Sequence, residues 1–315
     1  MEPTEELLAR VAWLERDTER IRAFNVSSSG TPATADYSQA GGRLTLTTGT
    51  PVTTADVTSA GTLYYTPYLH NRLALYSSGA WAECTFSERS LSLTLTSGSV
   101  YDVFAYSNSG TVTLETLVWT SATARATDLT TQDGVLVKNG DATRRYLGTI
   151  YASGTNTTED SAKLRAVWNY YNRVPRQMYC TDTTDSWTYN SATPREARAQ
   201  STLGVSRFGF VIGVAGAYVS ATNQSFGYIA SSSLTVNPAI GLDSATTASQ
   251  MFGGVVSVGN TTIGTLAAQY KGYPAIGYHF LCRTESEFTT TTTNWIGDNG
   301  VPAFLSAGMI GEIFG

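Results

Sequence analysis

The chain has 315 residues, of which 42% are hydrophobic and 14% charged, and its net charge is -5. This length leaves room for two domains of about 150 residues each. The negative charge argues against a nucleic-acid partner, which requires a basic surface to neutralise phosphates. No stretch reaches the roughly 18 apolar residues of a membrane span, so we expect no membrane insertion. The low charge and the abundance of Thr, Ser, Gly and Tyr favour a mainly β fold.

Residues 1–24 carry a heptad pattern. Leu7, Leu14 and Ile21 fall at d positions, and Val11 and Thr18 fall at a positions. This spacing predicts a short parallel coiled coil that joins copies of the chain, three in preference to two. An amphipathic helix packed on its own domain is the alternative, because isolated helices of this length are only weakly stable.

The flanking positions of the heptads support the parallel coil. In a parallel coil a g residue faces the e residue five positions further along the partner. The resulting pairs have opposite charge: Arg10 with Glu15, and Asp17 with Arg22.

Residues 25–42 are mostly Ser, Thr, Ala and Gly without periodicity, which predicts a linker. Residues 43–176 then show short alternating segments, which argue for an antiparallel sandwich or barrel, and we expect a β-sandwich domain there. Two segments look like hairpins, with turns at residues 77–80 and 107–110, and Asn139-Gly140 is a strong turn signal. One helix is predicted at about 159–172, capped by Thr158 and stopped by Pro175.

Residues 177–315 are richer in Gly and predict a second, jelly-roll-like β domain. Strand candidates lie at 205–214, 226–229, 234–236, 255–258, 276–282 and 307–314. The last segment suggests that the end of the chain is tied into a sheet. Cys84, Cys180 and Cys282 are too scattered for a disulfide frame or a zinc site, so we expect buried thiols and synthesis in a reducing cytoplasm.

Catalytic motifs are missing from the sequence. It has no Gly-x-Ser-x-Gly, no phosphate-binding Gly-x-x-x-x-Gly-Lys and no His-Glu-x-x-His. His70 and His279 stand outside any motif, and a structural role for His279 is the favoured interpretation. Carboxylate pairs that a glycoside hydrolase could use are present, at Asp182 with Asp185, at Glu285 with Glu287, and at Asp298. We predict no catalytic residues, no metal site and no cofactor.

Aromatic side chains are the stronger candidates for ligand contact, because their faces stack on sugar rings and dominate interfaces. Trp187, Tyr189 and Trp295 are the candidate ligand-binding aromatics. A core position is the alternative for each of them.

Several short sequence segments in residues 43–176 match segments of a known protein module, in the same order. They include Leu63-Tyr64-Tyr65-Thr66-Pro67-Tyr68, Gln132-Asp133-Gly134-Val135-Leu136-Val137-Lys138 and Val167-Trp168-Asn169-Tyr170-Tyr171-Asn172-Arg173-Val174-Pro175-Arg176. This region resembles a module of structural proteins of tailed bacteriophages. Residues 308–315 are similar to the closing strand of trimeric jelly-roll tips on phage fibres.

The resemblance implies a virion protein, at the virion surface, and transfers no catalytic residues. Together with the heptads it predicts a homotrimeric fibre, spike or capsid-decoration protein that is anchored by its N-terminus. The partners expected are further copies of the chain, other capsid or tail proteins, and a host-surface glycan met by residues 177–315. A tailspike-type polysaccharide depolymerase and a purely structural capsid cement protein are the alternatives.

Overall fold

The computed structural model describes residues 40–229, 236–249, 264–287, 293–298, 300 and 306–315. Residues 38–315 form one compact unit, and its described part is mainly β, as predicted. The predicted coiled coil at 1–24 and linker residues 25–39 lie outside the described residues. The linker's last residues already belong to the fold, since Ala40 bridges to Leu73 and Gly42 begins the first strand.

Residues 42–151 contribute two small sheets and most of a larger one. The small sheets are β1 (Gly42–Thr45), β3 (Thr62–Pro67) and β6 (Arg89–Ser92), and the pair β4 (Arg72–Ser77) and β5 (Ala80–Thr85). The larger sheet runs β8 (Thr111–Val118), β7 (Val100–Asn108), β11 (Asp141–Tyr151), β10 (Val135–Lys138) and β9 (Leu129–Gln132), with β14 (Val167–Asn169) on β11.

The two predicted hairpins are confirmed as β4–β5 and β7–β8. Ser78 and Gly79 have φ of 53° and 82°, and Ser109 and Gly110 have φ of 50° and 84°. Two successive residues with positive φ form the two-residue turn whose twist matches that of antiparallel strands. The turn after β10 is confirmed as well, with Lys138 paired to Asp141.

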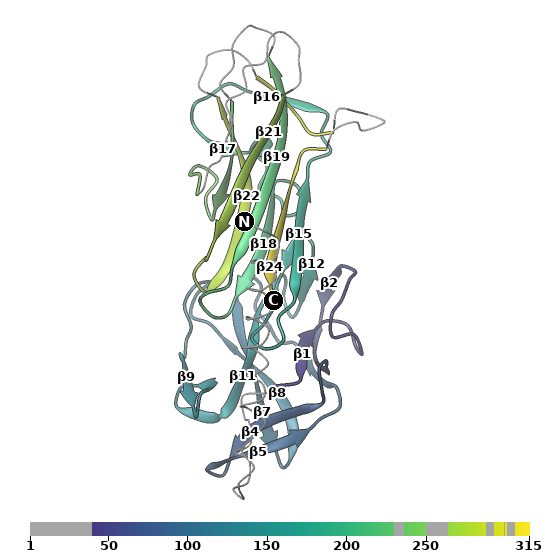
Figure 1. Ribbon diagram of the computed structural model, residues 1–315, viewed down its shortest axis with the longest axis vertical. Helices are drawn as coiled ribbons and strands as arrows, with labels where there is room; N and C mark the ends of the chain where they lie inside the picture. Colours follow the sequence, from purple (N-terminus) through teal and green to yellow (C-terminus); the bar gives the residue numbers. More distant parts are fainter. Residues whose placement is uncertain (1–39, 230–235, 250–263, 288–292, 299, 301–305) are drawn as a thin grey trace, which may run out of the picture. The chain divides into compact units, whose positions relative to one another are not determined.

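Two further sheets hold most of the remaining chain (Figure 1). One runs β17 (Arg195–Glu196), β22 (Gly277–Glu287), β18 (Arg207–Ile212), β13 (Leu164–Arg165), β12 (Thr158–Ser161) and β2 (Val57–Ala60), with β20 (Val236–Leu242) on β22. The other, which we call the C-terminal sheet, runs β15 (Pro175–Thr181), β24 (Gly308–Phe314), β19 (Val219–Ile229), β23 (Thr293–Ile296) and β16 (Ser186–Tyr189), with β21 (Gly264–Gly272) on β19. A 3-10 helix, η1, spans Ala197–Ala199.

The helix predicted at 159–172 is wrong. These residues form the three short strands β12, β13 and β14. The helical spacing arose because Leu164, Val167 and Trp168 are all buried, but they are buried from successive strands and not from one helix face. Tertiary pairing decides the local structure: β13 pairs with β18 and β14 with β11.

Most predicted strands of the C-terminal part are confirmed. The described strands β18, β19, β22 and β24 match the candidates at 205–214, 226–229, 276–282 and 307–314. Of the candidate at 234–236 only Val236 is described, and it begins β20. Residues 255–258 lie outside the described residues. The end of the chain is tied into a sheet as expected, because β24 is hydrogen-bonded to β15 on one side and β19 on the other.

The main buried apolar cluster contains residues from both sides of the predicted domain boundary at residue 177. Phe104 and Tyr146 come from β7 and β11, whereas Phe208 and Ile313 come from β18 and β24. A second cluster holds only residues 40–167. The strand pairs of the described residues are antiparallel except β13–β18, which joins Leu164 to Gly209 across that boundary. The division into 43–176 and 177–315 stays a prediction.

Candidate functional site

The C-terminal sheet has one face turned away from the core. Exposed and buried residues alternate along β15, β24, β19 and β21, as they do where one face of a sheet packs inside and the other remains open. We call the open side the outer face. Its exposed or half-buried residues are Pro175, Gln177, Tyr179, Thr181, Ser220, Thr222, Gln224, Thr265, Ala267, Gln269, Lys271, Gly308, Ile310, Glu312 and Phe314.

Strand register arranges the outer face in rows. Ile310 lies opposite Tyr179 on one side and Thr222 on the other, and Thr222 is opposite Gln269. Directly opposed residues of antiparallel strands have Cβ atoms only about 5 Å apart. Each row is therefore a continuous line of neighbouring side chains across four strands.

The next row carries the charges of the outer face. It consists of Gln177, Glu312, Ser220 and Lys271, in that order across the sheet. Glu312 on β24 and Lys271 on β21 are the charged side chains among the described residues of this face. They lie on opposite sides of β19, about 10 Å apart at the usual strand spacing.

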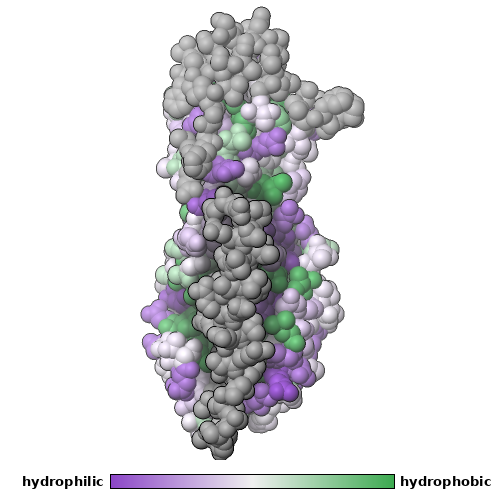
Figure 2. Space-filling view, in the orientation of Figure 1, coloured by the Kyte–Doolittle hydropathy of each residue, from purple (hydrophilic) through white to green (hydrophobic). Residues whose placement is uncertain are grey.

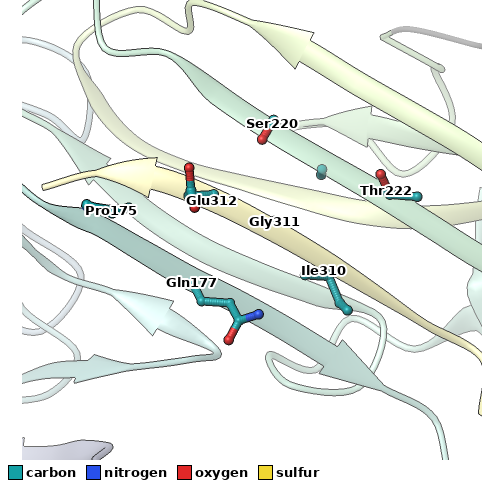
Figure 3. Close-up of a pocket in the computed structure, with 8 residues that line it drawn as sticks. Pro175, Gln177, Ser220, Thr222, Ile310, Gly311 and Glu312 are labelled. Carbon is teal, nitrogen blue, oxygen red and sulfur yellow. The ribbon is translucent and has the colours of Figure 1, made fainter. Parts of the chain in front are cut away.

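The outer face is hollowed along β24. A depression of about 620 Å³ is lined by residues of β15, β24 and β19, among them Gln177, Ser220, Thr222, Ile310 and Glu312 (Figure 3). A second depression of about 270 Å³ continues past Ile310 to Tyr179 and Gln224. Side chains of both polar and apolar kind border this surface.

Exposed large apolar side chains gather on this sheet. Eight such residues are exposed in the described chain, and five lie on or beside the outer face: Tyr179, Tyr218, Tyr273, Ile310 and Phe314. Ile310 is 55% exposed and Tyr273 is 70% exposed. The ring centres of Tyr218 and Tyr273 are 5.4 Å apart, just before β19 begins and just after β21 ends. Among the residues that Figure 2 colours, apolar residues stand in separate patches between hydrophilic ones on the side that it displays.

The opposite side of the same strands fixes the outer face in place. Met178, Cys180, Met309 and Ile313 are buried in the main apolar cluster, against Phe208 of β18. Gly311 lies between them without a side chain, because an added Cβ would stand 2.5 Å from Phe208 Cζ. A rigid packed underside of this kind holds the outer side chains in fixed positions.

The three aromatics predicted to bind ligand come together, but on the inner side of the sheet. Trp187 and Trp295 are directly opposed in β16 and β23. Trp295 is 1% exposed and packs with Val236 and Leu266. Trp187 Nε1 donates a 2.8 Å hydrogen bond to Glu285 Oε2.

Tyr189 is held by its neighbours in the same region. Its hydroxyl donates to Thr193 O at 2.5 Å, and the Arg195 guanidinium lies 3.8 Å from the ring centre. The ligand-binding role of Trp187, Tyr189 and Trp295 stays a prediction.

The carboxylates considered for hydrolysis lie in separate ion pairs and turns. Glu285 accepts hydrogen bonds from Trp187, Arg195 Nε (2.9 Å) and the Arg198 backbone N–H (3.1 Å). Burial raises the pKa of Glu285, although these hydrogen bonds oppose the shift. Asp182 pairs with Arg198 at 2.8 Å. Burial would raise the pKa of Asp182, but hydrogen bonds from Arg198 and Thr184 outweigh it and lower the pKa.

The other carboxylates considered for hydrolysis, Glu287, Asp185 and Asp298, lie in three different environments. Glu287 is fully buried, Asp185 is exposed, and Asp298 accepts a hydrogen bond from the Gly300 N–H. His279 has a carboxylate and a carbonyl partner, Asp243 Oδ2 at 2.7 Å and Ala275 O at 2.9 Å. This arrangement fits the structural role expected for His279.

Sequence reasoning assigned no role to Tyr179 or Ile310. The signal that could have found them is the adjacent apolar pairs Met309-Ile310 and Ile313-Phe314, which give both faces of one strand apolar side chains. A strand with only one buried face alternates apolar with polar residues. The predicted oligomerisation residues Leu7, Arg10, Val11, Leu14, Glu15, Asp17, Thr18, Ile21 and Arg22 lie outside the described residues.

The described residues also bear on two other kinds of site, metal centres and membrane-spanning helices. No three His, Cys, Asp or Glu side chains of that part of the chain are grouped so that they could hold a metal ion. Within the same residues, no helix has the length and apolar character needed to cross a membrane.

Comparison with known proteins gave structural similarities alone. No family model matches the sequence, and no curated protein matches it. The chain is similar to Eiger TNF of S. frugiperda, with 6% identity and a TM-score of 0.27 over 45% of this chain and 92% of that one. It is also similar to the infectious bursal disease virus Gx strain structure, with 11% identity and a TM-score of 0.24 over 82% of this chain and 69% of that one. TM-scores this low carry no argument about function.

Proposed function

We propose that the chain is a homotrimeric structural protein of a tailed-phage virion, a fibre, spike or capsid-decoration protein. Residues 1–24 join the copies and anchor them to the particle. The β region from residue 177 onward contacts the host surface, and the candidate ligand there is a glycan. The protein acts by adhesion and assembly, without turning over a substrate.

The outer face of the C-terminal sheet is the observation that carries the assembly part of this proposal. It is a broad, low-charge surface with exposed Tyr179, Ile310 and Phe314 and a rigid underside. Large apolar side chains that remain exposed and gather on one face mark interaction sites in proteins. The phage-like phrases in residues 43–176 and the heptads of residues 7–22 support a symmetric virion part.

In a trimer, weak contacts between each copy and the host ligand are sufficient for adhesion. Three copies of one surface on a common assembly bind a repeated host ligand with an avidity well above that of a single copy. Closed cyclic symmetry also presents the three surfaces in the same orientation. Adhesion then follows from repetition and requires no catalytic group.

Mass measurement of the full chain tests the assembly. We expect native mass spectrometry and light scattering at micromolar concentration to give three times the 33.7 kDa chain mass. A monomer would contradict the proposal. Deletion of residues 1–24 should lower the oligomeric mass or weaken incorporation into particles, and an unaffected trimer with normal incorporation would remove the role given to that segment.

Two further measurements separate the proposal from its alternatives. Incubation with host capsular polysaccharide should release no new reducing ends, whereas a depolymerase would release them. Fluorescently labelled protein should bind uninfected host cells, whereas a purely structural cement protein would not.

A further inference from the structure

We infer that the outer face of the C-terminal sheet is the surface through which copies of this chain contact one another. The inference rests on the proposed trimer and names the part of each copy that meets its neighbours. Its occupant is a second copy of the chain, and the central row, Tyr179, Ile310 and Thr222, lies at the middle of the contact.

The composition of the outer face fits a protein interface. Interface cores are depleted of charge and enriched in aromatic and apolar side chains. The outer face has one acidic and one basic residue, and Ile310 at its centre is 55% exposed. A nucleic acid would need a basic surface, and Lys271 alone does not supply one.

The positions of the two charges make the face complementary to itself. Glu312 lies on the β24 side of β19 and Lys271 on the β21 side, in one row. In a ring, one side of each copy meets the other side of the next copy. The acidic side of one face then lies near the basic side of its neighbour, which favours this orientation over one that brings like charges together.

The area of the outer face explains why residues 1–24 are also needed to hold the copies together. Four strands about 4.8 Å apart, with outward residues repeating about every 6.8 Å over four rows, cover roughly 500 Å². A stable interface buries about 800 Å² per partner. The outer face is therefore too small to hold two free copies firmly, but it suffices once residues 1–24 raise the effective concentration of the copies.

Charge-inverted partners provide the sharpest test, because they report contact between copies and not within one. Glu312→Lys makes the outer face basic and Lys271→Glu makes it acidic. The two full-length variants, one carrying a mass tag, are refolded together and counted by native mass spectrometry. We expect mixed trimers above the three-quarters given by random association at equal concentration.

The apolar centre is tested with a matched pair of variants. Ile310→Asp should raise the concentration at which the full-length trimer dissociates at least about tenfold. Leu69→Asp is the control: Leu69 is also exposed, at 68%, but lies outside the C-terminal sheet. The Leu69→Asp trimer should dissociate at the same concentration as the wild-type trimer.

The outcomes distinguish this inference from the proposed function. The inference is overturned if the wild type is a trimer, the charge variants mix at random, and the Ile310→Asp and Leu69→Asp trimers dissociate at the same concentration. The proposed trimer would then remain intact. A wild-type monomer overturns both. Loss of glycan binding in Ile310→Asp with an unchanged trimer would make the outer face a ligand surface and overturn contact between copies.

Discussion

The thiols of Cys180 and Cys282 illustrate how strongly the core controls single residues. Both are buried, and burial raises the pKa of each thiol to about 12. Thiolate is the reactive form, so at pH 8 each carries about a thousandfold less of it than an unperturbed thiol. Cys84 is only half-buried, and its pKa is raised by burial and by nearby Glu83.

A labelling experiment checks this difference. We predict that a thiol reagent at pH 8 modifies one cysteine per native chain, Cys84, and all three after denaturation in guanidinium chloride. The Cys84→Ser variant serves as control and should show no fast native reaction. Rapid native labelling of Cys180 or Cys282 would contradict the packing described for β15 and β22.

Gly311 is a residue-scale requirement of the C-terminal sheet. An added Cβ would lie 2.5 Å from Phe208 Cζ and 2.8 Å from Ser220 O, and the backbone atom cannot move aside cheaply. We predict that Gly311→Ala lowers the free energy of unfolding by about 1–3 kcal/mol, the usual range for overpacking.

Urea unfolding measures the effect of Gly311→Ala. Gly61→Ala is the matched control, because the nearest atom to its added Cβ is 3.8 Å away, at Asn156 O. The control should remain within about 0.5 kcal/mol of the wild type. Equal stability of the two variants would show that β24 can shift away from β18.

At the scale of elements, an ion-pair cluster joins the strands that replace the predicted helix. Asp160 on β12 accepts from Arg165 on β13 at 3.0 Å and from Arg176 on β15 at 2.7 Å. Arg176 also donates to Thr53 O at 2.7 Å. These side chains are largely buried, so the interactions with its partners must compensate each charge for the hydration that it loses on burial.

We predict that Asp160→Asn destabilises the protein by about 3 kcal/mol, because two buried guanidinium groups lose their shared carboxylate. The change would appear as a lower urea midpoint with an unchanged slope. Glu83→Gln is the control, since its pair with Arg72 is exposed and surface pairs contribute little. A loss of the same size in both variants would contradict the role given to burial.

The elements that could be predicted from sequence are those with local signals. The hairpins β4–β5 and β7–β8 follow from Ser-Gly turns between alternating segments. Residues 159–172 lack such a signal, and their strands depend on pairing with β11 and β18, which come from elsewhere in the chain. Nothing local in the sequence indicates that β24 lies between β15 and β19.

The candidate site was predictable only in part for the same reason. The strand at 307–314 is predicted from its apolar composition, but the row of Tyr179, Ile310 and Thr222 exists only once three distant strands are in register. Conversely, Trp187 and Trp295 were visible as large aromatics, and only the fold turns Trp295 into the core. Burial is a property of the packed sheet, and residue type alone does not set it.

At the scale of the whole molecule, the acids buried in protonated form set an upper pH limit on stability. Burial raises the pKa of Tyr278 to about 12, as it does for Cys180 and Cys282, and it also raises that of Tyr65 and Tyr146. In the unfolded chain these thiols lose their protons near pH 9 and the tyrosines near pH 10. The unfolded state then binds fewer protons than the folded state, so stability falls as pH rises.

We predict a constant urea midpoint up to about pH 8.5, followed by a progressive fall between about pH 9 and 12. Each of the two buried thiols lowers the free energy of unfolding by about 1.4 kcal/mol per pH unit once it is ionised in the unfolded chain alone. The double variant Cys180→Ala, Cys282→Ala is the control: it should start from a lower midpoint and decline less steeply between about pH 9 and 12, because only the tyrosine-dependent part of the decline remains. An identical pH profile for the wild type and the double variant would mean that the folded protein ionises these thiols as readily as the unfolded chain does, which a closed core around β15 and β22 does not permit.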